Sequence, residues 1–404
     1  MQRYLFIYFT IFMLSVSLIY AEKNEMDRVK SVLLKLKEQY APDKRTSIFN
    51  LEAETVNNIF VIKGETNIKI VNDELAKELN KLNIKFRIEV SILPAKILGE
   101  NRFGVVNLSV ANLRVSPDHA AEMATQSLLG TAVKVFNKRD GWYQVQTPDG
   151  YIGWVDQDGI TLMDLQTVNN WISAEKVIYT NEFSFVYSSC DIKSRRVSDI
   201  VLGDLLKYVG KENSFVKVEY PNGRIGYIEE ENCKIFSKWL KETAPTENSI
   251  LETAYKFIGM PYFWGGTSAK AMDCSGFSKT VYYMNGVLLQ RDASQQVLTG
   301  DLVDTKNGFE NCKPGDLLFF GRKATDTLPE KITHVAIYIG NLDFIHSAGE
   351  ISIDSFDKNK PNFNEYRLKQ FIRAKRILSS LDKNGIYTLK NFGQYKGELF
   401  NDNE

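Results

Sequence analysis

Asp-Cys-Ser-Gly-Phe at residues 273–277 decides the interpretation of this chain, because two histidines follow its cysteine at spacings that a Cys-His enzyme could use. The chain contains three histidines, and the last two, His334 and His346, both lie downstream of Cys274. A thiol is a weak nucleophile at neutral pH until a base takes its proton. A cysteine followed by two such bases therefore predicts a Cys-His catalytic site.

The segment around this cysteine predicts a helix start. Phe277 and Val281 share one apolar helix face, and Asn-Gly at 285–286 supplies a stop. Asp273 is a suitable N-cap, which places Cys274 in the first turn. Free backbone N–H groups and the helix dipole favour negative charge there, so we expect the pKa of the thiol to be lowered.

The two histidines belong to a predicted hairpin. Residues 334–339 and 342–347 alternate as strands around Gly-Asn at 340–341. A two-residue loop would place His334 and His346 on opposite faces, whereas a three- or five-residue loop or a bulge places both on one face. If both histidines belong to one site, the hairpin must therefore have an odd-numbered loop or a bulge.

These motifs together resemble the NlpC/P60 family of cell-wall cysteine peptidases. The further motifs are Pro-Tyr-Phe-Trp-Gly-Gly at 261–266, Lys-Pro-Gly-Asp-Leu at 313–317 and His-Val-Ala-Ile-Tyr-Ile-Gly at 334–340. The resemblance covers about 245–380 and implies a papain-like α+β fold.

The resemblance also implies the catalytic roles. Cys274 is the expected nucleophile and His334 the base that then protonates the leaving amine. His346 orients the ring of His334, and the hydroxyl of Tyr262 helps to hold the oxyanion, with a core aromatic as the alternative for Tyr262.

An internal repeat precedes this segment. Gly-Tyr-Ile-Gly-Trp-Val at 150–155 recurs as Gly-Arg-Ile-Gly-Tyr-Ile at 223–228, and Leu-Gly at 129–130 recurs at 202–203. Short alternating strands and Gly-containing turns predict a small β-barrel in each copy. The pattern resembles bacterial SH3 (SH3b) domains, more closely in the first copy.

SH3b domains before such a peptidase resemble enzymes that release dipeptides from peptidoglycan stem peptides by cutting the γ-D-glutamyl bond to lysine or diaminopimelate. Asp292 matches the family aspartate that meets the substrate's free amine, for which a carboxylate is the right partner. The other residues expected to bind substrate are Glu122, Tyr151, Arg291, Asp273, Ser275 and Ser294. Glu122 as a solvated charge, Tyr151 as a barrel-core residue, and Ser275 and Ser294 as cap or turn residues are the alternatives. A pocket that must pair with a free amine would select released fragments, as in cell wall recycling, over intact wall.

The bulk properties set the remaining expectations. The 50 basic and 50 acidic residues balance, which gives no sign of a nucleic-acid surface. An uncharged run up to Ala21 predicts a secretion signal at 1–21 and export to the periplasm or cell exterior, with an uncleaved membrane anchor as the alternative. No stable membrane partner, cofactor or metal site is expected, and His119 is isolated. Cys190 and Cys233 either pair or stay free, and a bridge from Cys274 to Cys312 is not expected.

The chain is therefore predicted to be multidomain, with an N-terminal α/β unit, two SH3-like β-barrels and a papain-like α+β peptidase. The segments are 22–100 for the helical/β unit, 101–165 and 166–240 for the SH3b domains, 241–380 for the peptidase, and 381–404 for a tail that looks dispensable. The predicted function is a secreted cysteine peptidase acting on stem peptides with a free N-terminal L-Ala. The alternatives are a murein endopeptidase anchored to intact wall by its SH3b domains, and a non-catalytic wall-binding protein. Acyl transfer by a circularly permuted relative is poorly supported, because its histidine would precede its cysteine.

Overall fold

The computed structural model describes residues 23–401, so the predicted signal at 1–21 lies outside the described residues. The chain divides into two compact units, Met1–Gly99 and Glu100–Glu404. Within the described range, none of the helices has the length and apolar character needed to cross a membrane.

The N-terminal unit is an α/β structure. A helix over residues 23–40 and helix α2 (Val71–Asn80) accompany a sheet of order β1-β2-β3, with β1 (Phe49–Val56), β2 (Ile59–Thr66) and β3 (Phe86–Ile92). Asn57 and Asn58 both have positive φ, as a tight two-residue hairpin between β1 and β2 requires. α2 then crosses over to make β3 parallel to β2. Leu36 and Leu75 from the two helices meet Ile62 from the sheet in one core.

The second unit begins with a seven-stranded antiparallel sheet of order β10-β4-β7-β8-β9-β5-β6. Its strands are β4 (Phe103–Val106), β5 (Val110–Arg114), β6 (Met123–Leu128), β7 (Ala132–Arg139), β8 (Trp142–Gln146), β9 (Ile152–Asp156) and β10 (Ile160–Met163). Helix α3 (Leu165–Ser173) then leads to a second sheet, and its N-cap Asp164 accepts the N–H of Thr167.

The second sheet repeats this topology strand for strand. Its order is β13-β12-β16-β15-β14-β11-β17, the same arrangement as the first with each strand number raised by seven. Its strands are β11 (Lys176–Tyr179), β12 (Phe183–Tyr187), β13 (Arg196–Val201), β14 (Leu205–Glu212), β15 (Phe215–Glu219), β16 (Ile225–Glu229) and β17 (Cys233–Ile235), followed by helix α4 (Phe236–Glu242).

A repeated glycine explains part of the sequence repeat. Gly153 in β9 and Gly226 in β16 occupy equivalent positions, where a Cβ atom would lie 2.9 Å from Leu113 Cβ and 2.4 Å from Val186 Cγ1. Both contacts are closer than side chains tolerate, so each copy needs a glycine where its strand crosses a core side chain.

The catalytic segment is built on a six-stranded sheet of order β21-β26-β22-β23-β24-β25. Its strands are β21 (Asp301–Val303), β22 (Leu317–Arg322), β23 (Lys331–Gly340), β24 (Asp343–Ala348), β25 (Glu350–Ser355) and β26 (Phe371–Arg376). Its helices are α5 (Glu247–Tyr255), α6 (Cys274–Tyr283), α7 (Ala293–Gln296) and α8 (Glu365–Gln370). α6 packs on β23 and β24, with Phe277 and Val281 fully buried against Val335 and Ile345.

Short elements complete the chain. They are the strands β18 (Thr267–Ser268), β19 (Ala271–Met272), β20 (Val287–Leu288) and β27 (Tyr387–Thr388), and the 3-10 turns η1 (Lys96–Leu98), η2 (Gln157–Gly159), η3 (Glu230–Asn232), η4 (Leu378–Ser380), η5 (Leu389–Asn391) and η6 (Gly393–Lys396).

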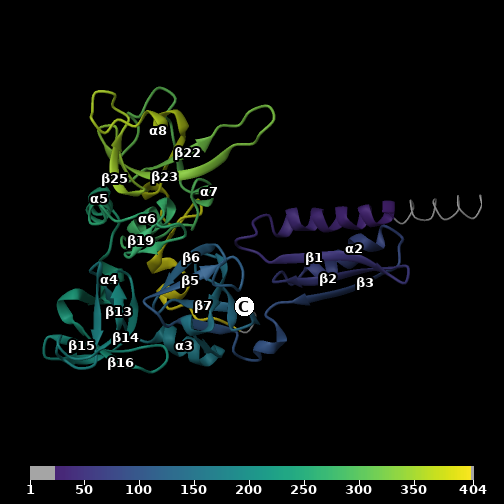
Figure 1. The fold of residues 1–404 in the computed structure, drawn as a ribbon, viewed down its shortest axis with the longest axis horizontal. Helices are drawn as coiled ribbons and strands as arrows, with labels where there is room; N and C mark the ends of the chain where they lie inside the picture. The colour runs from purple at the N-terminus through teal and green to yellow at the C-terminus, as the bar shows by residue number, and fades with distance from the viewer. Residues whose placement is uncertain (1–22, 402–404) are drawn as a thin grey trace, which may run out of the picture. The chain divides into compact units, whose positions relative to one another are not determined.

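The first seven-stranded sheet contacts the nucleophile helix directly. In Figure 1, α6 lies between the six-stranded sheet and strands β5 and β6. A buried ion pair joins Lys279 of α6 to Asp149 in the turn before β9. The N–H of Thr267 donates to Gln126 Oε1 at 3.0 Å. The first sheet therefore contacts both α6 and the strand β18 that precedes it.

The C-terminal segment corrects the expectation of a dispensable tail. Leu389 is fully buried in a core with Tyr283 and Tyr395, and β27 pairs with β20. Gln394 exchanges two hydrogen bonds with the backbone of Ala132, at 3.1 and 3.2 Å. The described part of this segment thus packs against both the catalytic segment and the first sheet.

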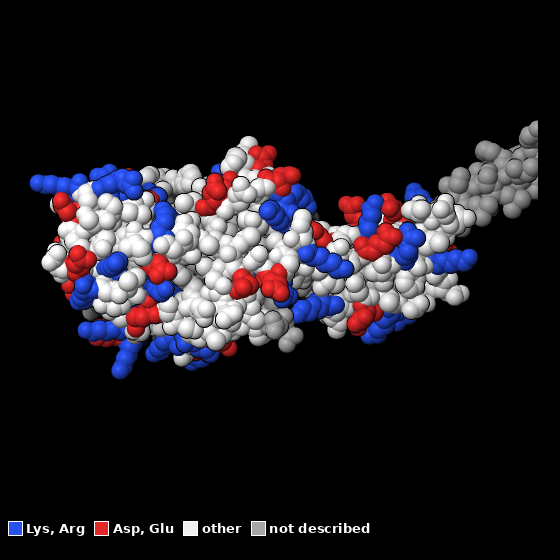
Figure 2. Space-filling view, turned by 90° about the horizontal axis from the view of Figure 1, so that it is seen from below, with Lys and Arg blue, Asp and Glu red and all other residues white. Residues whose placement is uncertain are grey.

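Charge on the surface follows the balanced composition. On the face drawn in Figure 2, basic and acidic side chains are intermixed over the described residues. All four cysteines, Cys190, Cys233, Cys274 and Cys312, are free thiols.

Candidate active site

Cys274 is the first residue of α6, as its sequence context predicts. Asp273 is the N-cap, in extended conformation, and its Oδ1 accepts the N–H of Gly276 at 2.7 Å. A Cβ atom at Gly276 would lie 1.9 Å from the carbonyl oxygen of Gly266. The glycine in Asp-Cys-Ser-Gly-Phe thus lets the helix start lie directly against the Gly-Gly turn of the motif at 261–266.

The expected lowering of the thiol's pKa is wrong for the free enzyme. Burial and the neighbouring charge of Asp273 raise the pKa of Cys274 to about 11, against the opposing effects of the Val335 and Ser275 N–H groups and of Arg291. The side chain is 8% exposed, so desolvation of the thiolate outweighs the helix start. Cys274 is therefore a neutral thiol at physiological pH.

The hairpin has the odd register that a shared site requires. β23 and β24 pair Tyr338 with Phe344 and Gly340 with Asp343, which leaves Ile339 as a bulge. Both histidines then face the same way, and His334 Nε2 lies 2.8 Å from His346 Nδ1. The prediction that a bulge or odd loop brings them together is confirmed.

The pair continues into a third residue that the motifs did not reveal. His346 Nε2 lies 3.0 Å from Asp354 Oδ2, and Asn364 Nδ2 donates to the same oxygen at 2.5 Å. Burial would raise the pKa of Asp354, but hydrogen bonds from His346 and Asn364 outweigh burial and lower the pKa. An ionised Asp354 accepts a hydrogen bond from His346 Nε2–H, which leaves His346 Nδ1 as the acceptor for His334 Nε2–H.

This chain of hydrogen bonds decides which nitrogen of His334 can act as a base. With Nε2 protonated and donating to His346, Nδ1 of His334 carries the free lone pair. Burial, the charge of Arg367 and His346 hold the pKa of His334 well below its ordinary value. The ring is therefore neutral at physiological pH, and the start of α6 packs against its strand.

Tyr262 is fixed beside the thiol by backbone pairing. Its N–H donates to the carbonyl oxygen of Gly349 at 2.8 Å, and it forms a bridge with Met272. Burial and the nearby Cys274 and Asp273 raise its pKa to about 12. The hydroxyl therefore stays protonated and can donate a hydrogen bond.

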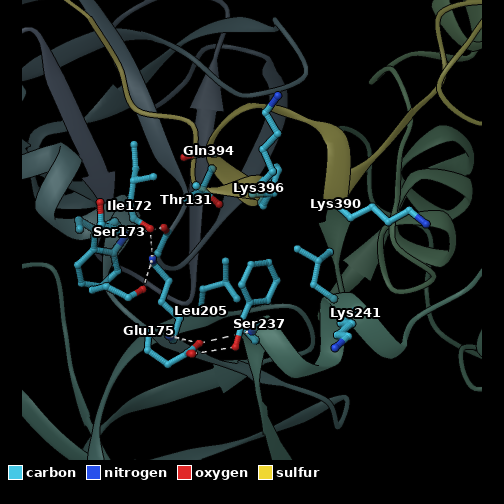
Figure 3. A pocket seen from close by; sticks show the side chains of 18 residues that line it. Thr131, Ile172, Ser173, Glu175, Leu205, Ser237, Lys241, Lys390, Gln394 and Lys396 are labelled. Atoms are coloured by element: carbon cyan, nitrogen blue, oxygen red, sulfur yellow. Dashed lines mark hydrogen bonds between the residues drawn. The ribbon is translucent and has the colours of Figure 1, made fainter.

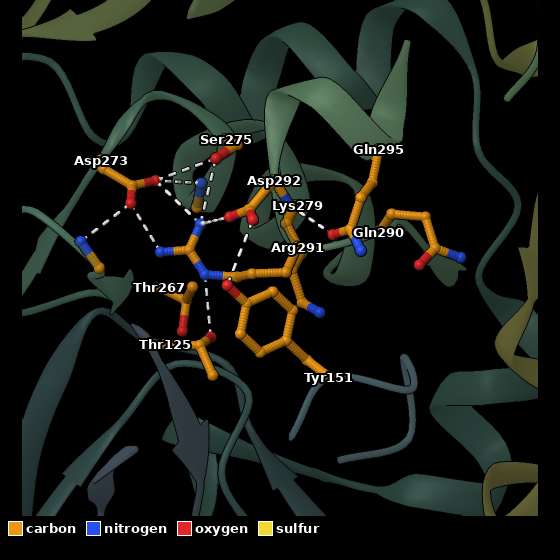
Figure 4. A network of polar contacts seen from close by, with 12 residues as sticks. Thr125, Tyr151, Thr267, Asp273, Ser275, Lys279, Gln290, Arg291, Asp292 and Gln295 are labelled. Atoms are coloured by element: carbon orange, nitrogen blue, oxygen red, sulfur yellow. Dashed lines mark hydrogen bonds and ion pairs between the residues drawn. The ribbon is translucent and has the colours of Figure 1, made fainter. Parts of the chain in front are cut away.

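Arg291 and Asp273 form a buried, bidentate ion pair. Arg291 is 1% exposed, and its Nη atoms lie 2.6 and 3.1 Å from the two oxygens of Asp273 (Figure 4). Its nitrogens also lie 2.9 Å from Thr125 Oγ1, 3.1 Å from Ser275 Oγ and 3.9 Å from Asp292 Oδ1. These three predicted substrate residues, Arg291, Asp273 and Ser275, hold one another and the first sheet in place at the start of α6.

Two polar contacts bring residues of the first sheet to the catalytic segment. The hydroxyl of Tyr151 donates to Asp292 Oδ2 at 3.2 Å (Figure 4), and Trp264 Nε1 donates to Glu122 Oε1 at 2.9 Å. Tyr151 is buried, Asp292 is half-buried and Glu122 is exposed. The predicted amine-binding residues therefore lie at the boundary of the first sheet with the catalytic segment. Ser294 follows on α7 and is half-buried.

A large cavity lies elsewhere, lined by residues of both sheets, α3, α4 and the C-terminal segment. Its volume is about 670 Å³, and none of the predicted site residues lines it. Figure 3 shows Thr131, Ser237 and Gln394 among the residues around this cavity. Lys176 is buried there, and its Nζ donates to the carbonyl oxygens of Ile172 and Ala174. Burial lowers the pKa of Lys176 to about 8.

Within residues 23–401, His, Cys, Asp and Glu side chains do not gather in threes as metal ligands would. His119 is exposed, with its Nε2 3.5 Å from Asp156 Oδ2.

Comparison with known proteins adds the family context. Residues 259–370 match the NlpC/P60 family, and residues 113–160 match the bacterial dipeptidyl-peptidase SH3 domain. The chain is similar to dipeptidyl-peptidase 6 of Lysinibacillus sphaericus, with 28% identity over 271 residues, which cover 65% of this chain and 94% of that protein. It is also similar to the gamma-D-glutamyl-L-lysine dipeptidyl-peptidase of Bacillus cereus, with 28% identity over 269 residues, covering 64% and 77%.

A solved structure shares the fold. The crystal structure of an NlpC/P60 family protein from Bacillus cereus aligns with a TM-score of 0.59 at 23% identity, covering 68% of this chain and 99% of that chain. The prediction of a multidomain chain with an NlpC/P60 and an SH3-like domain is confirmed.

Proposed function

Because this chain is a cysteine-type peptidase whose NlpC/P60 domain follows an SH3 domain of the bacterial dipeptidyl-peptidase type, we propose that it releases dipeptides from peptidoglycan stem peptides. The substrate is a stem peptide with a free N-terminal L-Ala, and the bond cut is the γ-D-glutamyl bond to lysine or diaminopimelate. The catalytic segment has a papain-like arrangement, with a nucleophile helix packed on the histidine strands.

The contact of Tyr151 with Asp292 carries this proposal. This hydroxyl–carboxylate hydrogen bond of 3.2 Å joins the first SH3-like domain to the catalytic segment. Glu122 and Trp264 form a second such contact. An ammonium bound between the carboxylates of Asp292 and Glu122 would gain two charge-assisted partners in a half-buried place. Substrates whose amine is blocked would lose these two charge-assisted contacts.

The first chemical step follows from the neutral thiol and neutral imidazole. His334 Nδ1 takes the proton of Cys274 as Sγ attacks the carbonyl carbon of the γ-D-glutamyl amide, so no ion pair is needed beforehand. The carbonyl oxygen becomes an oxyanion that the hydroxyl of Tyr262 stabilises.

The remaining steps return the enzyme to its starting state. The C–N bond breaks as His334 gives its proton to the leaving amine, and a thioester remains on Cys274. Water then attacks the thioester carbonyl while His334 takes a proton from it. The C–S bond breaks, the thiol regains the proton, and L-Ala-D-Glu leaves. His346 and Asp354 keep the base in the same tautomer throughout.

The proposal is tested by mass spectrometry of L-Ala-γ-D-Glu-L-Lys and its diaminopimelate analogue, each with a free and an acetylated N-terminus. Cys274→Ala and Cys190→Ala proteins serve as matched variants, since Cys190 is a half-buried thiol in the loop between β12 and β13. We expect the wild type and Cys190→Ala to release L-Ala-D-Glu from the free-amine peptides alone, and Cys274→Ala to release none. Equal cleavage of acetylated peptides would favour an endopeptidase of intact wall. Absence of Cys274-dependent cleavage would favour a wall-binding protein.

Export stays a prediction from the sequence of residues 1–21. We propose that the enzyme works in the cell envelope or outside the cell, where it meets peptidoglycan stem peptides. Fractionation of cells producing the full chain, with detection of the protein in each fraction, tests this.

A further inference from the structure

Arg367 and the catalytic base contact the same phenylalanine ring. Its guanidinium carbon is 5.8 Å from the ring centroid of Phe320, and the ring of His334 is 5.7 Å from the same ring. Its backbone N–H donates to Asn364 Oδ1, and Asn364 in turn donates to Asp354 of the histidine chain. The position of Arg367 is thus fixed by the same residues that orient the base.

The guanidinium of Arg367 is charged but unpaired. It makes neither a hydrogen bond nor an ion pair with any residue in the range 23–401, although the side chain is half-buried. Arg291 in the same domain shows the usual arrangement, in which the carboxylate of Asp273 pairs with the planar guanidinium. The nearest acidic partner on the histidine chain, Asp354, already accepts from His346 and Asn364.

The charge of Arg367 acts on the reacting groups. It is among the causes that lower the pKa of His334, and Cys274 and Tyr262 are among the groups that act on Arg367 itself. The geometry agrees, because Arg367 and His334 both contact the ring of Phe320, which places the guanidinium near the catalytic base.

The side of the site on which Arg367 lies follows from the fold. The amine-binding residues come from the first sheet and the start of α7, whereas α8 packs on β22. Figure 1 shows α6 between α8 and strands β5 and β6. A stem peptide whose free amine contacts Asp292 therefore has its leaving residue directed toward α8.

We infer that Arg367 binds a carboxylate of the leaving diamino acid, and so selects substrates whose third residue carries a free carboxylate. This inference rests on the proposed function. The carboxylate can be the C-terminal one of a tripeptide ending in lysine, or the side-chain carboxylate of diaminopimelate; both offer the planar pair of oxygens that a guanidinium fork fits.

The test compares four free-amine peptides on the full chain. They are L-Ala-γ-D-Glu-L-Lys as the acid and as the C-terminal amide, the tetrapeptide L-Ala-γ-D-Glu-L-Lys-D-Ala, and the diaminopimelate tripeptide with its α-carboxylate amidated. Arg367→Gln removes the fork, and Lys369→Gln removes the same charge from an exposed position of the same helix.

For the wild type we expect kcat/KM for the lysine acid to exceed that for the amide by roughly 10- to 100-fold, mainly through KM. Arg367→Gln should bring this ratio close to one by lowering the acid value alone, while Lys369→Gln keeps it. Unchanged amide cleavage shows that Arg367→Gln is folded. Strong cleavage of the amidated diaminopimelate peptide, but not of the lysine amide or tetrapeptide, would assign the side-chain carboxylate as the ligand.

Failure of this inference and failure of the proposed function give different results. Equal cleavage of acid and amide by the wild type, or a ratio that survives Arg367→Gln, overturns the role of Arg367 and leaves the peptidase intact. If no peptide is cleaved, the proposed function fails. Calorimetric titration of Cys274→Ala with the acid and amide peptides then tests Arg367 separately, because tighter binding of the acid supports a carboxylate site and equal binding overturns it.

Discussion

The hydroxyl of Tyr151 donates to the carboxylate of Asp292 at 3.2 Å, although 141 positions separate the two residues in the chain. This hydrogen bond joins a turn of the first SH3-like domain to the N-cap of α7 in the peptidase domain. Under the proposed function, the substrate's amine would therefore meet a site built from two domains, in which Tyr151 of one domain contacts Asp292 of the other.

Tyr151→Phe tests this relationship with little change in packing. Tyr151 is 7% exposed and its ring keeps its place, but Asp292 loses the hydrogen bond from the Tyr151 hydroxyl. We expect kcat/KM for a free-amine stem peptide to fall roughly 10-fold, in line with one lost hydrogen bond to a charged group. Asp292→Asn should lower it by about 100-fold, because the opposite charge is lost as well.

Tyr143→Phe, a change in the same sheet, serves as the control and should have no effect. An acetylated peptide should be cleaved equally slowly by all these variants. A free-amine preference that survives Asp292→Asn would place the amine elsewhere.

Asp354→Asn should weaken the base without removing it. The loss of the carboxylate removes the partner that keeps the proton on His346 Nε2, so the tautomer of His334 is no longer fixed. We expect kcat to fall by roughly 10- to 100-fold with little change in KM. Nitrogen-15 NMR of the imidazoles should show a mixture of tautomers in the variant and one tautomer of each ring in the wild type.

Asp343→Asn is the matched change on the neighbouring strand, where the carboxylate pairs with Lys360 instead. It should leave both kcat and the imidazole spectrum unaltered. A normal spectrum in Asp354→Asn would show that His346 needs no carboxylate.

The pH dependence of kcat/KM should be a broad plateau. His334, with its pKa held well below the ordinary value, is an active base at pH values above that pKa, so activity persists well below pH 6.5 and falls only when the ring becomes protonated. Cys274, with its pKa raised to about 11, stays a protonated thiol across the neutral range. The rate of iodoacetamide alkylation of Cys274 should accordingly keep rising up to about pH 11.

On the alkaline side of the plateau, the fall in kcat/KM should follow the deprotonation of the substrate's α-amine. An α-amine has a pKa of about 8 and loses its charge above that value, so kcat/KM for free-amine peptides should fall there. A peptide carrying a trimethylated amine, which stays charged, should not show that fall. A thiol that alkylates fully at pH 7 would instead mean a preformed thiolate, contrary to the burial of Cys274.

The ion pair of Lys279 with Asp149 should stabilise the contact of the two domains. The side chains are 16% and 4% exposed, so removing one partner leaves a buried charge unpaired. Lys279→Met or Asp149→Asn alone should lower the free energy of unfolding by about 3–5 kcal/mol, and the double variant by less than the sum. Urea unfolding followed by tryptophan fluorescence measures this. Additive effects of the two changes would mean that the pair contributes no coupling.

Much of the catalytic centre could be predicted because its determinants are local. An aspartate before Cys274 marks a helix start, and the parity of the hairpin decides whether His334 and His346 share a face. Both inferences need residues close together in the sequence. Asp354 was missed because its contact depends on which strand pairs with β24, and that pairing is set by the whole sheet.

The rest could not be predicted because it depends on burial between distant segments. The raised pKa of Cys274 arises from the packing of α6, and no spacing of residues indicates that desolvation exceeds the helix effect. Arg367 and Leu389 carry no motif, and their positions follow from how α8 and the C-terminal segment close over the sheets.

The two seven-stranded sheets share a topology but carry different side chains at equivalent positions. At the repeat offset of 73 residues, Arg224 stands where the first copy has Tyr151, and Arg195 stands where it has Glu122. Arg224 stacks 4.3 Å over the ring of Tyr220 and donates to the backbone carbonyl of Asn107 in the first copy. The proposed function thus assigns this turn of the first copy to the substrate's amine. The second copy carries a cation there, which would repel an ammonium, and uses the same turn to contact the first copy.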